Sequence, residues 1–331
     1  MVSRPLITVL GASGFIGSSV VAELARRPVR LRTVARRPTA RAATGRTPAD
    51  VETHAVDLSR PGGLAEAVAG SDAVIHLAAH LEGAGSWRTA DGDPSAGRLN
   101  TGLVRELADA LRPARAALRP PPVVLFASTA TASADTWATA DGTGHLSGYE
   151  RQKLAAERLL ADATAEGALC GVSLRLPTVF GPAPAPAVDR GVVSAMARRA
   201  LDGAPITMWH DGTVRRDLLY VRDAAAAFAA ALDHAPALAG RHWSVGSGRG
   251  TPLGDVFRAL AATVADRTGR PPVPVRRVEP PAHASAADFR DVRADHAPFR
   301  SVTGWAPRVP LDEALARTVA ALAGPQGKDL L

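Results

Sequence analysis

The sequence has little cysteine and lacks long apolar runs. Cys170 is the single cysteine among 331 residues, which excludes an intrachain disulfide and a zinc site built on cysteine pairs, and fits a reducing compartment. No apolar run approaches the roughly 20 residues that span a bilayer, and residues 1–5 lead straight into a strand pattern without the apolar segment of a signal peptide. We therefore expect a cytoplasmic protein with no membrane partner.

Lysine and tyrosine are also scarce. Lysine occurs only as Lys153 and Lys328, and tyrosine only as Tyr149 and Tyr220. The formal net charge of +7, from 39 basic and 32 acidic residues, therefore comes almost wholly from arginine. These arginines are spread along the chain and aromatic residues make up only 4% of it, which argues against a nucleic-acid partner.

With 46% hydrophobic and 21% charged residues the chain can form a sizeable core, and its length suits about two units of roughly 150 residues. In the first half, short apolar runs alternate with helical patterns, which is typical of an α/β protein with a parallel sheet. The expected strands are 6–10, 31–35, 51–56, 73–77, 123–127 and 172–176, and the expected helices include 15–26, 98–111 and 149–166.

Glycines follow the first expected strand at a regular spacing. Gly11 permits a tight turn, Gly14 lets a pyrophosphate approach the start of the next helix, and Gly17 lets that helix pack on the strand. A glycine turn without a ligand is the alternative, but the strand, turn and helix context indicates a Rossmann dinucleotide site. The remaining residues assigned to this turn are Ser13, Phe15 and Ile16.

The second expected strand ends in Ala35, Arg36 and Arg37, with no acidic residue nearby. A carboxylate at this place holds the ribose 2′-hydroxyl of NAD, whereas a guanidinium binds the 2′-phosphate of NADP. Arginine pairs recur elsewhere in the chain, so the missing carboxylate is the stronger observation, and we expect NADPH/NADP+. Other residues expected to contact the cofactor follow the third and fourth strands: Asp57, Leu58, Leu77, Ala78 and Ala79.

A doubly wound Rossmann domain over residues 1–177 is predicted to precede a smaller mixed α/β lobe over 178–324. The boundary lies just before a segment rich in proline, residues 181–186, which cannot continue a helix or a central strand. Residues 217–245 are expected to fold back onto the first domain.

Tyr149 and Lys153 lie four residues apart in an expected helix, so their side chains share one face. An ammonium beside a phenol favours the phenolate, which predicts a lowered tyrosine pKa and an acid/base function near neutral pH. A hydroxyl from Ser128 or Thr129, at the carboxyl edge of the sheet, is placed to bind a substrate carbonyl. The alternatives are a solvated Tyr/Lys pair and ordinary turn chemistry.

These motifs occur in the order found in the extended short-chain dehydrogenase/reductase family, also called the NAD-dependent epimerase/dehydratase family, and most of the chain resembles it. The resemblance implies that Thr129 binds the reacting oxygen, that Tyr149 is the acid/base and that Lys153 binds the nicotinamide ribose. It also implies that Arg216 contacts the diphosphate of a nucleotide-sugar. Further residues assigned to the cofactor through it are Asn100, Pro177 and Val179. His80, after the fourth expected strand, is expected to line the substrate cleft, with covering of the sheet edge as the alternative.

Departures from the family pattern narrow the reaction. Ala130 and Thr131 stand where the 4,6-dehydratases have an Asp-Glu pair for elimination, which argues against a dehydratase. The sequence 285–288 replaces a common Arg-Pro-x-Asp, and Arg290 is the nearest arginine able to substitute. The 4-epimerases retain NAD, whereas Arg36 favours a consumed NADPH.

Segments 189–193 and 208–217 resemble the 4-ketoreductases that act on dTDP-4-keto-6-deoxyhexoses in deoxysugar and antibiotic biosynthesis. We therefore expect NADPH-dependent reduction at C4, a homodimer and no metal. Asp189, Arg190, Trp209 and His210 in these segments have ordinary alternatives in helix capping and packing. The other functions left open are a nucleotide-sugar 4-epimerase, a reductase of a small ketone similar to dihydroflavonol reductase, and a redox-sensing regulator.

Overall fold

The structure is a computed structural model that describes residues 4–36, 48–79, 97–112, 120–132, 146–183, 187, 189, 191–281, 284 and 286–324. Its centre is a parallel sheet of seven strands in the order β10-β6-β5-β4-β1-β2-β3. The strands are β1 (Leu6–Leu10), β2 (Arg30–Ala35), β3 (Asp50–Ala55), β4 (Ala73–His76), β5 (Val123–Thr129), β6 (Cys170–Leu176) and β10 (Arg241–Ser244). The doubly wound fold class predicted from the sequence is confirmed.

The expected strands form because their apolar runs are covered on both faces of the sheet. Leu10, Val74 and Leu125, for example, are completely buried. β5 runs two residues further than expected and ends at Thr129, which places that residue at the carboxyl edge of the sheet. The strand order reverses between β1 and β4, and this switch point is where such sheets bind ligands.

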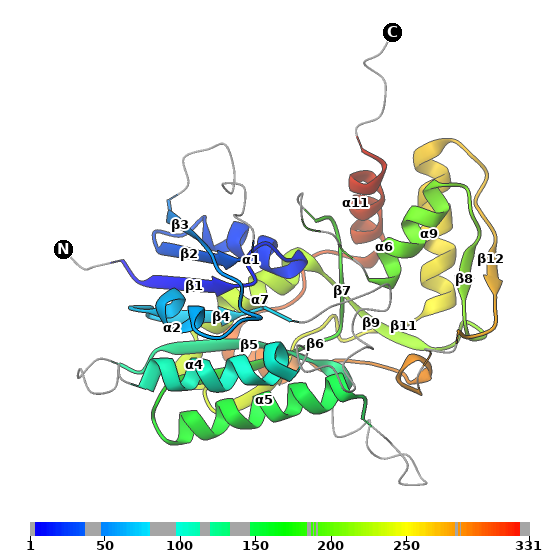
Figure 1. Ribbon diagram of the computed structural model, residues 1–331. Coiled ribbons are helices and arrows are strands. Elements are labelled where there is room, and N and C mark those ends of the chain that lie inside the picture. The colour runs from blue at the N-terminus through cyan, green and yellow to red at the C-terminus, as the bar shows by residue number, and fades with distance from the viewer. Residues whose placement is uncertain are drawn as a thin grey trace.

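Helices cover the two faces of the sheet and enclose separate cores (Figure 1). One face carries α1 (Phe15–Leu24), α7 (Val221–Asp233), α8 (Ala235–Leu238) and α10 (Ala297–Thr303). The other carries α2 (Gly63–Val68), α4 (Leu103–Leu111) and α5 (Gly148–Ala165), with a π-helical turn, η1 (Arg98–Gly102), leading into α4. A short 3₁₀ turn, η3 (Ala130–Ala132), follows β5.

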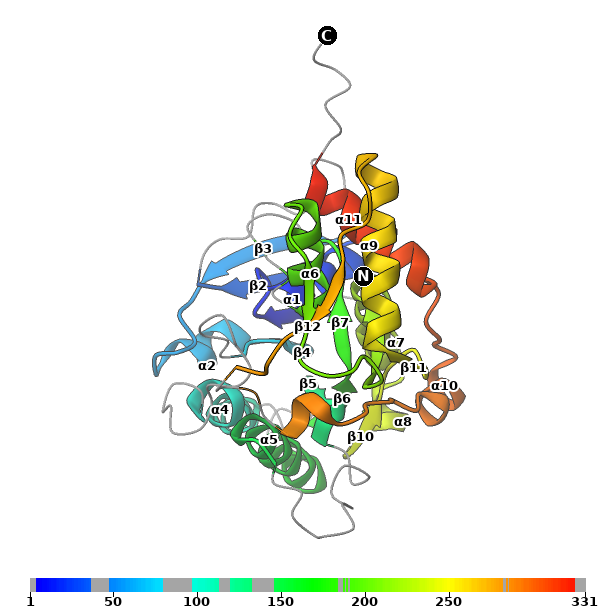
Figure 2. The same ribbon diagram turned by 90° about the vertical axis from the view of Figure 1, so that its right-hand side faces the viewer.

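A smaller lobe lies beyond the carboxyl edge of the sheet (Figures 1 and 2). Its own core includes Phe180, Phe257 and Leu315. It contains a three-stranded sheet, β11-β9-β7, and a two-stranded sheet, β12-β8. The elements are β7 (Thr178–Phe180), α6 (Val192–Leu201), β8 (Ile206–Met208), β9 (Arg215–Tyr220), β11 (Gly250–Pro252), α9 (Leu253–Thr268), β12 (Val275–Arg277), η5 (Ala286–Phe289) and α11 (Leu311–Ala323).

The chain returns from the lobe to the main sheet. After β9, α7 packs against α1, and β10 then pairs with β6 as the edge strand. The chain therefore passes between the lobe and the first domain at both ends of this return, and these two crossings join the lobe to the domain. In the described parts of the chain, no helix combines the length and the apolarity required to traverse a bilayer.

Candidate active site

The glycine turn forms a tight backbone cradle at the switch point. Gly11 has a φ of +81°, and a Cβ there would lie 2.8 Å from the backbone nitrogen of Ala78, which follows β4. A Cβ on Gly17 would lie 2.1 Å from the carbonyl oxygen of Gly11, so only glycine lets α1 pack this closely. Gly14 is the N-cap of α1, whose first turn has no acidic residue. This helix start favours a bound anion, and the cradle fits a pyrophosphate.

The ends of β2 and β3 lie beside this cradle and differ in charge. Arg36 follows β2 and is exposed, and Arg37 lies outside the described residues. After β3, Asp57 Oδ1 accepts hydrogen bonds from the backbone N–H and the hydroxyl of Ser59, at 3.0 and 2.6 Å. These bonds, with help from Arg60 and Arg36, lower the pKa of Asp57. Arg36 is therefore close enough to β3 to act electrostatically on Asp57.

Lys153 is held deep beside the end of β5. Its side chain is 3% exposed, and Nζ donates a 2.8 Å hydrogen bond to the carbonyl oxygen of Ala127. Nζ also lies 4.6 Å from the ring centroid of Phe126 and 5.6 Å from that of Tyr149. Tyr149 and Lys153 therefore face the same side of α5, at the carboxyl edge of the sheet.

The ammonium does not make the phenol more acidic, which corrects the expectation from the sequence. Burial, together with the Glu150 carboxylate, raises the pKa of Tyr149 to about 12. Burial also lowers the pKa of Lys153 to about 8, although Glu157 opposes this effect. The loss of hydration was not visible in the residue spacing, and it disfavours the charged form of each group. At neutral pH, Tyr149 is consequently a protonated phenol, suited to donating a proton.

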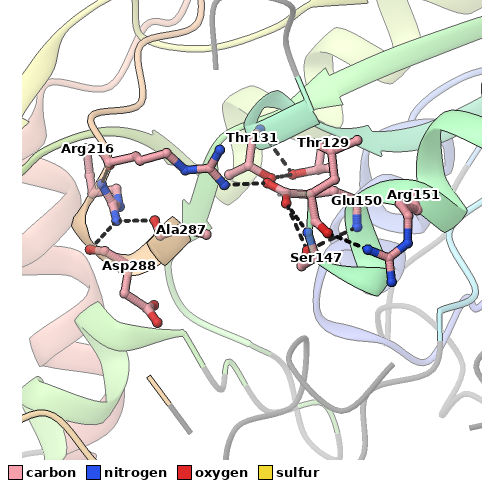
Figure 3. Close-up of polar contacts among 10 residues, drawn as sticks. Thr129, Thr131, Ser147, Glu150, Arg151, Arg216, Ala287 and Asp288 are labelled. Carbon is pink, nitrogen blue, oxygen red and sulfur yellow. Dashed lines mark hydrogen bonds and ion pairs between the residues drawn. The ribbon is translucent and has the colours of Figure 1, made fainter. Parts of the chain in front are cut away.

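Hydroxyl groups gather where β5 ends. Thr129 Oγ1 and Thr131 Oγ1 lie 2.9 Å apart (Figure 3), and the η3 turn that contains Thr131 packs against α5. Ser128 Oγ is buried and has no hydrogen-bond partner among the described residues. This edge of the sheet therefore offers several hydroxyls to a carbonyl oxygen.

Asn100 supports α5 from the π-helical turn. It is fully buried, and its Nδ2 donates a 2.8 Å hydrogen bond to Oε1 of Gln152, next to Lys153. Thr101 Oγ1 donates to the carbonyl oxygen of Gln152 at 3.1 Å. Such π-turns often occur at functional sites. In this structure Asn100 contacts α5 through Gln152, and its expected contact with the cofactor stays a prediction.

His76, the last residue of β4, has a buried imidazole. This residue was assigned no catalytic role from the sequence. Its ring packs on Phe126 with centroids 5.4 Å apart. Burial and the charge of Lys153 lower its pKa to about 3, so the imidazole is neutral. Neither ring nitrogen has a hydrogen-bond partner in the described part of the chain.

The guanidinium of Arg216, at the start of β9, donates hydrogen bonds to backbone carbonyl oxygens of the protein itself. Its Nη2 donates to the carbonyl oxygens of Ala287 and Asp288, at 3.1 and 2.7 Å, and its Nη1 donates to that of Arg290 (Figure 3). Burial lowers the pKa of Arg216. Arg290 in turn donates to Oε1 of Glu150 at 3.4 Å. The arginine expected to bind a diphosphate is thus holding the η5 segment, and Arg290 reaches across to α5.

The remaining residues that were predicted from the sequence lie in different parts of the structure. Asp189 Oδ1 accepts from the backbone N–H of Gly191 at 2.7 Å, and Oδ2 accepts from the Ser194 hydroxyl at 2.5 Å, so Asp189 serves the start of α6. Pro177 directly follows β6, and Val179 lies in β7, which pairs with β9. His80 and Arg190 lie outside the described residues. Within the described ranges, no cluster of three or more potential metal ligands occurs.

Sequence reasoning missed two residues that contact the site, Glu150 and Gln152. Glu150 had a signal, because Ser147 and Glu150 have the spacing of a capping box, which the structure contains. Gln152 had none, since its contacts depend on how η1 approaches α5.

Known proteins share both the sequence pattern and the fold. UDP-glucose 4-epimerase of Mycolicibacterium smegmatis is 34% identical over 141 residues, which is 43% of this chain and 42% of that protein. The chain thus aligns with less than half the length of this curated relative. UDP-glucose 4-epimerase of Thermus thermophilus, solved as a complex with NAD, superposes with a TM-score of 0.74 at 27% identity, covering 97% of this chain and 99% of that one.

MoeE5 in complex with UDP-glucuronic acid and NAD has a TM-score of 0.73 at 27% identity, covering 95% of this chain and 97% of the other. The model of the NAD dependent epimerase/dehydratase family matches residues 7–246, which contain the glycine cradle, the Tyr149/Lys153 pair and the return of the chain to the main sheet. The chain therefore belongs to the NAD dependent epimerase/dehydratase family.

Proposed function

We propose that the protein reduces the C4 ketone of a dTDP-linked 4-keto-6-deoxyhexose with NADPH. The observation that carries this proposal is the placement of Tyr149 on the same helix face as Lys153, whose Nζ is bonded to Ala127 in β5, near the carboxyl end of that strand. A phenol with a pKa of about 12 is a proton donor at neutral pH, as reduction of a ketone requires. The absence of an Asp-Glu pair after Thr129 argues against elimination of water.

The cofactor assignment is supported by the cradle and by the end of β2. The cradle around Gly11 and Gly14 is too tight for side chains on its inner face and leaves the start of α1 open to a pyrophosphate. Arg36 stands near the end of β2, where NAD-binding chains have a carboxylate that would repel the 2′-phosphate of NADP. When bound there, the reduced nicotinamide supplies hydride. The complexes of MoeE5 with NAD and nucleotide-sugars support a nicotinamide cofactor and a nucleotide-sugar substrate.

In this proposal three residues, Tyr149, Thr129 and Lys153, contribute to protonation of the C4 oxygen. Tyr149 donates its phenolic proton to that oxygen as negative charge develops on it. Thr129 donates a hydrogen bond to the same oxygen and orients the carbonyl. Lys153, held by Ala127, keeps a positive charge near the phenol and stabilises the phenolate that the proton transfer leaves.

The decisive experiment supplies dTDP-4-keto-6-deoxyglucose and follows nicotinamide absorbance. We expect oxidation of NADPH in proportion to ketone consumed, and a Tyr149→Phe variant that binds NADPH but loses at least about 100-fold in rate, because the proton donor is gone. NMR of the product then gives the configuration at C4. Substantial residual reduction by the Phe variant would overturn the role of Tyr149.

A nucleotide-sugar 4-epimerase is the second candidate, favoured by the similarity to the mycobacterial and Thermus UDP-glucose 4-epimerases. An epimerase interconverts UDP-glucose and UDP-galactose without net consumption of cofactor. Interconversion with substoichiometric NAD, and no oxidation of NADPH by the keto-sugar, would replace the reductase proposal with this one.

A further inference from the structure

One ion pair joins the smaller lobe to the catalytic helix. Nη2 of Arg290, which follows η5, lies 3.4 Å from Oε1 of Glu150, in the first turn of α5. The two side chains are 19% and 2% exposed, so the contact is largely removed from water. Glu150 directly follows Tyr149 in the sequence. The lobe therefore places a positive charge against the carboxylate adjacent to the proposed proton donor.

Arg290 is positioned by other parts of the lobe. Arg216 donates from its two Nη atoms to the carbonyl oxygens of Arg215, Ala287, Asp288 and Arg290. These bonds fix the segment that carries Arg290 against the start of β9. The backbone of β9 is fixed in turn, because Asp217 accepts hydrogen bonds from Ser247, Gly248 and Ala294.

Glu150 is fixed from its own side by the capping box. Its Oε2 accepts from the backbone N–H of Ser147 at 2.8 Å and from the Ser147 hydroxyl at 2.9 Å, while Oε1 faces Arg290 (Figure 3). Because the carboxylate is held at the helix start, its charge stays at a constant place relative to Tyr149. Its charge acts on the phenol and raises the pKa of Tyr149.

Few other charges lie around the phenol. On α5 itself, Lys153 approaches the ring of Tyr149, and Arg151 donates to the Leu146 carbonyl. The elements packed against α5 contribute charged or titratable groups that are engaged elsewhere or neutral: Arg98 with Glu106, Arg112 with Glu166, Arg175 with Glu157, and the neutral His76 beside Lys153. From η5 and the residues after it come Asp288, Arg290 and Asp291.

We propose that Arg290 is a positioning residue that sets the acidity of Tyr149 through Glu150. While Arg290 neutralises the carboxylate, the phenol is closer to ionising. When Arg290 is drawn away, the uncompensated carboxylate holds the phenolic proton of Tyr149 more tightly still and makes the phenol a weaker acid. This inference rests on the proposed role of Tyr149 as proton donor. It makes the placement of the smaller lobe a determinant of the proton-transfer step.

The test exploits the two tyrosines of this chain. Uniform labelling with 3,5-difluorotyrosine gives a more acidic phenol that titrates in an accessible pH range, and ¹⁹F NMR then reports Tyr149 and Tyr220 separately, with Tyr149→Phe assigning the signals. We expect Glu150→Gln to increase the ionised fraction of residue 149 several-fold at a given pH, since glutamine keeps the cap and removes the charge. Arg290→Gln should decrease it several-fold, and Arg290→Lys should restore it.

A double variant separates action through Glu150 from direct action on the phenol. In the Glu150→Gln background, the effect of Arg290→Gln should largely vanish. Glu166→Gln, which removes a carboxylate at the far end of α5 from its pair with Arg112, is the matched control and should leave the titration unchanged. Unshifted titrations in Glu150→Gln and Arg290→Gln, or an Arg290 effect undiminished in the double variant, would overturn the proposal.

This readout uses no substrate and no cofactor, so it is independent of turnover. Loss of NADPH oxidation with an intact titration pattern would count against the proposed reaction and leave the coupling standing. A normal reaction with an unresponsive phenol would do the reverse. Circular dichroism of each variant confirms that the fold is retained.

Discussion

At the scale of single residues, burial dominates the chemistry of the site. Tyr149 and Lys153 have the spacing of a mutually stabilising pair, yet each is driven toward its neutral form, with pKa values of about 12 and about 8. The same environment keeps His76 neutral. The charges in this site, such as those of Glu150 and Arg290, act strongly because little water screens them.

Burial of Lys153 has a measurable cost. Its pKa is about 8 in the folded chain against an ordinary 10.5, so between these values the unfolded state binds more protons and stability rises with pH. Lys153→Met should therefore be more stable than the wild type at pH 7, by on the order of 1–3 kcal/mol, and the difference should shrink toward pH 10. Urea denaturation at both pH values measures this. A difference independent of pH would contradict it.

Arg36 provides a prediction about cofactor choice. If it binds a 2′-phosphate, Arg36→Ala should lower kcat/KM for NADPH by about tenfold or more relative to NADH, the size of a lost charge-assisted hydrogen bond. Arg30→Ala is the matched control, because Arg30 is an exposed arginine at the opposite end of the same strand. Equal losses with both cofactors would identify Arg36 as a solvated surface charge.

At the scale of elements, strands and helices were predictable because their patterns are local. The expected strands match those of the main sheet closely, and α5 spans Gly148–Ala165 against an expected 149–166. The π-turn at Asn100 was not predictable, because its contact is with Gln152, 52 residues further along the chain. The use of Arg216 was missed for the same reason, since its acceptors are carbonyls of a segment about 70 residues away.

The glycine cradle allows helix packing and cofactor binding to be separated. Gly17→Ala places a Cβ 2.1 Å from a carbonyl oxygen, so α1 must shift, and we expect a loss of stability of about 1–3 kcal/mol or more. In Gly14→Ala the new Cβ would lie 3.1 Å from the carbonyl oxygen of Gly11. We therefore expect a smaller loss of stability than for Gly17→Ala, together with weaker NADPH binding. Urea denaturation and NADPH fluorescence titration test both variants. Equal destabilisation by the two would contradict this division.

At the scale of the whole molecule, the relation between the lobes depends on a few polar contacts. Asp217 is completely buried and links β9 to the segment after β10 and to Ala294, in the last part of the chain. Arg216 and Arg290 continue this connection to α5. The homodimer expected from the family resemblance stays a prediction.

Replacing Asp217 tests how much this connection matters. Asp217→Asn turns one acceptor oxygen into a donor against backbone N–H groups, so we expect a loss of about 2–4 kcal/mol in stability. Asp211→Asn is the control, because Asp211 is exposed and bonds only to Thr213 among the contacts described, and it should change stability by about 0.5 kcal/mol or less. Comparable melting temperatures for the two variants would count against a linking role of Asp217.

The edge strand β10 has a consequence for biosynthesis. Because residues 241–244 pair with β6, one side of β6 has no neighbouring strand until most of the chain has left the ribosome. At about 5–20 residues per second, translation from the end of β6 to β10 lasts several seconds. During that time β6 presents an unpaired edge that invites aggregation, so a nascent chain paused before residue 241 is the species on which we expect a chaperone to act.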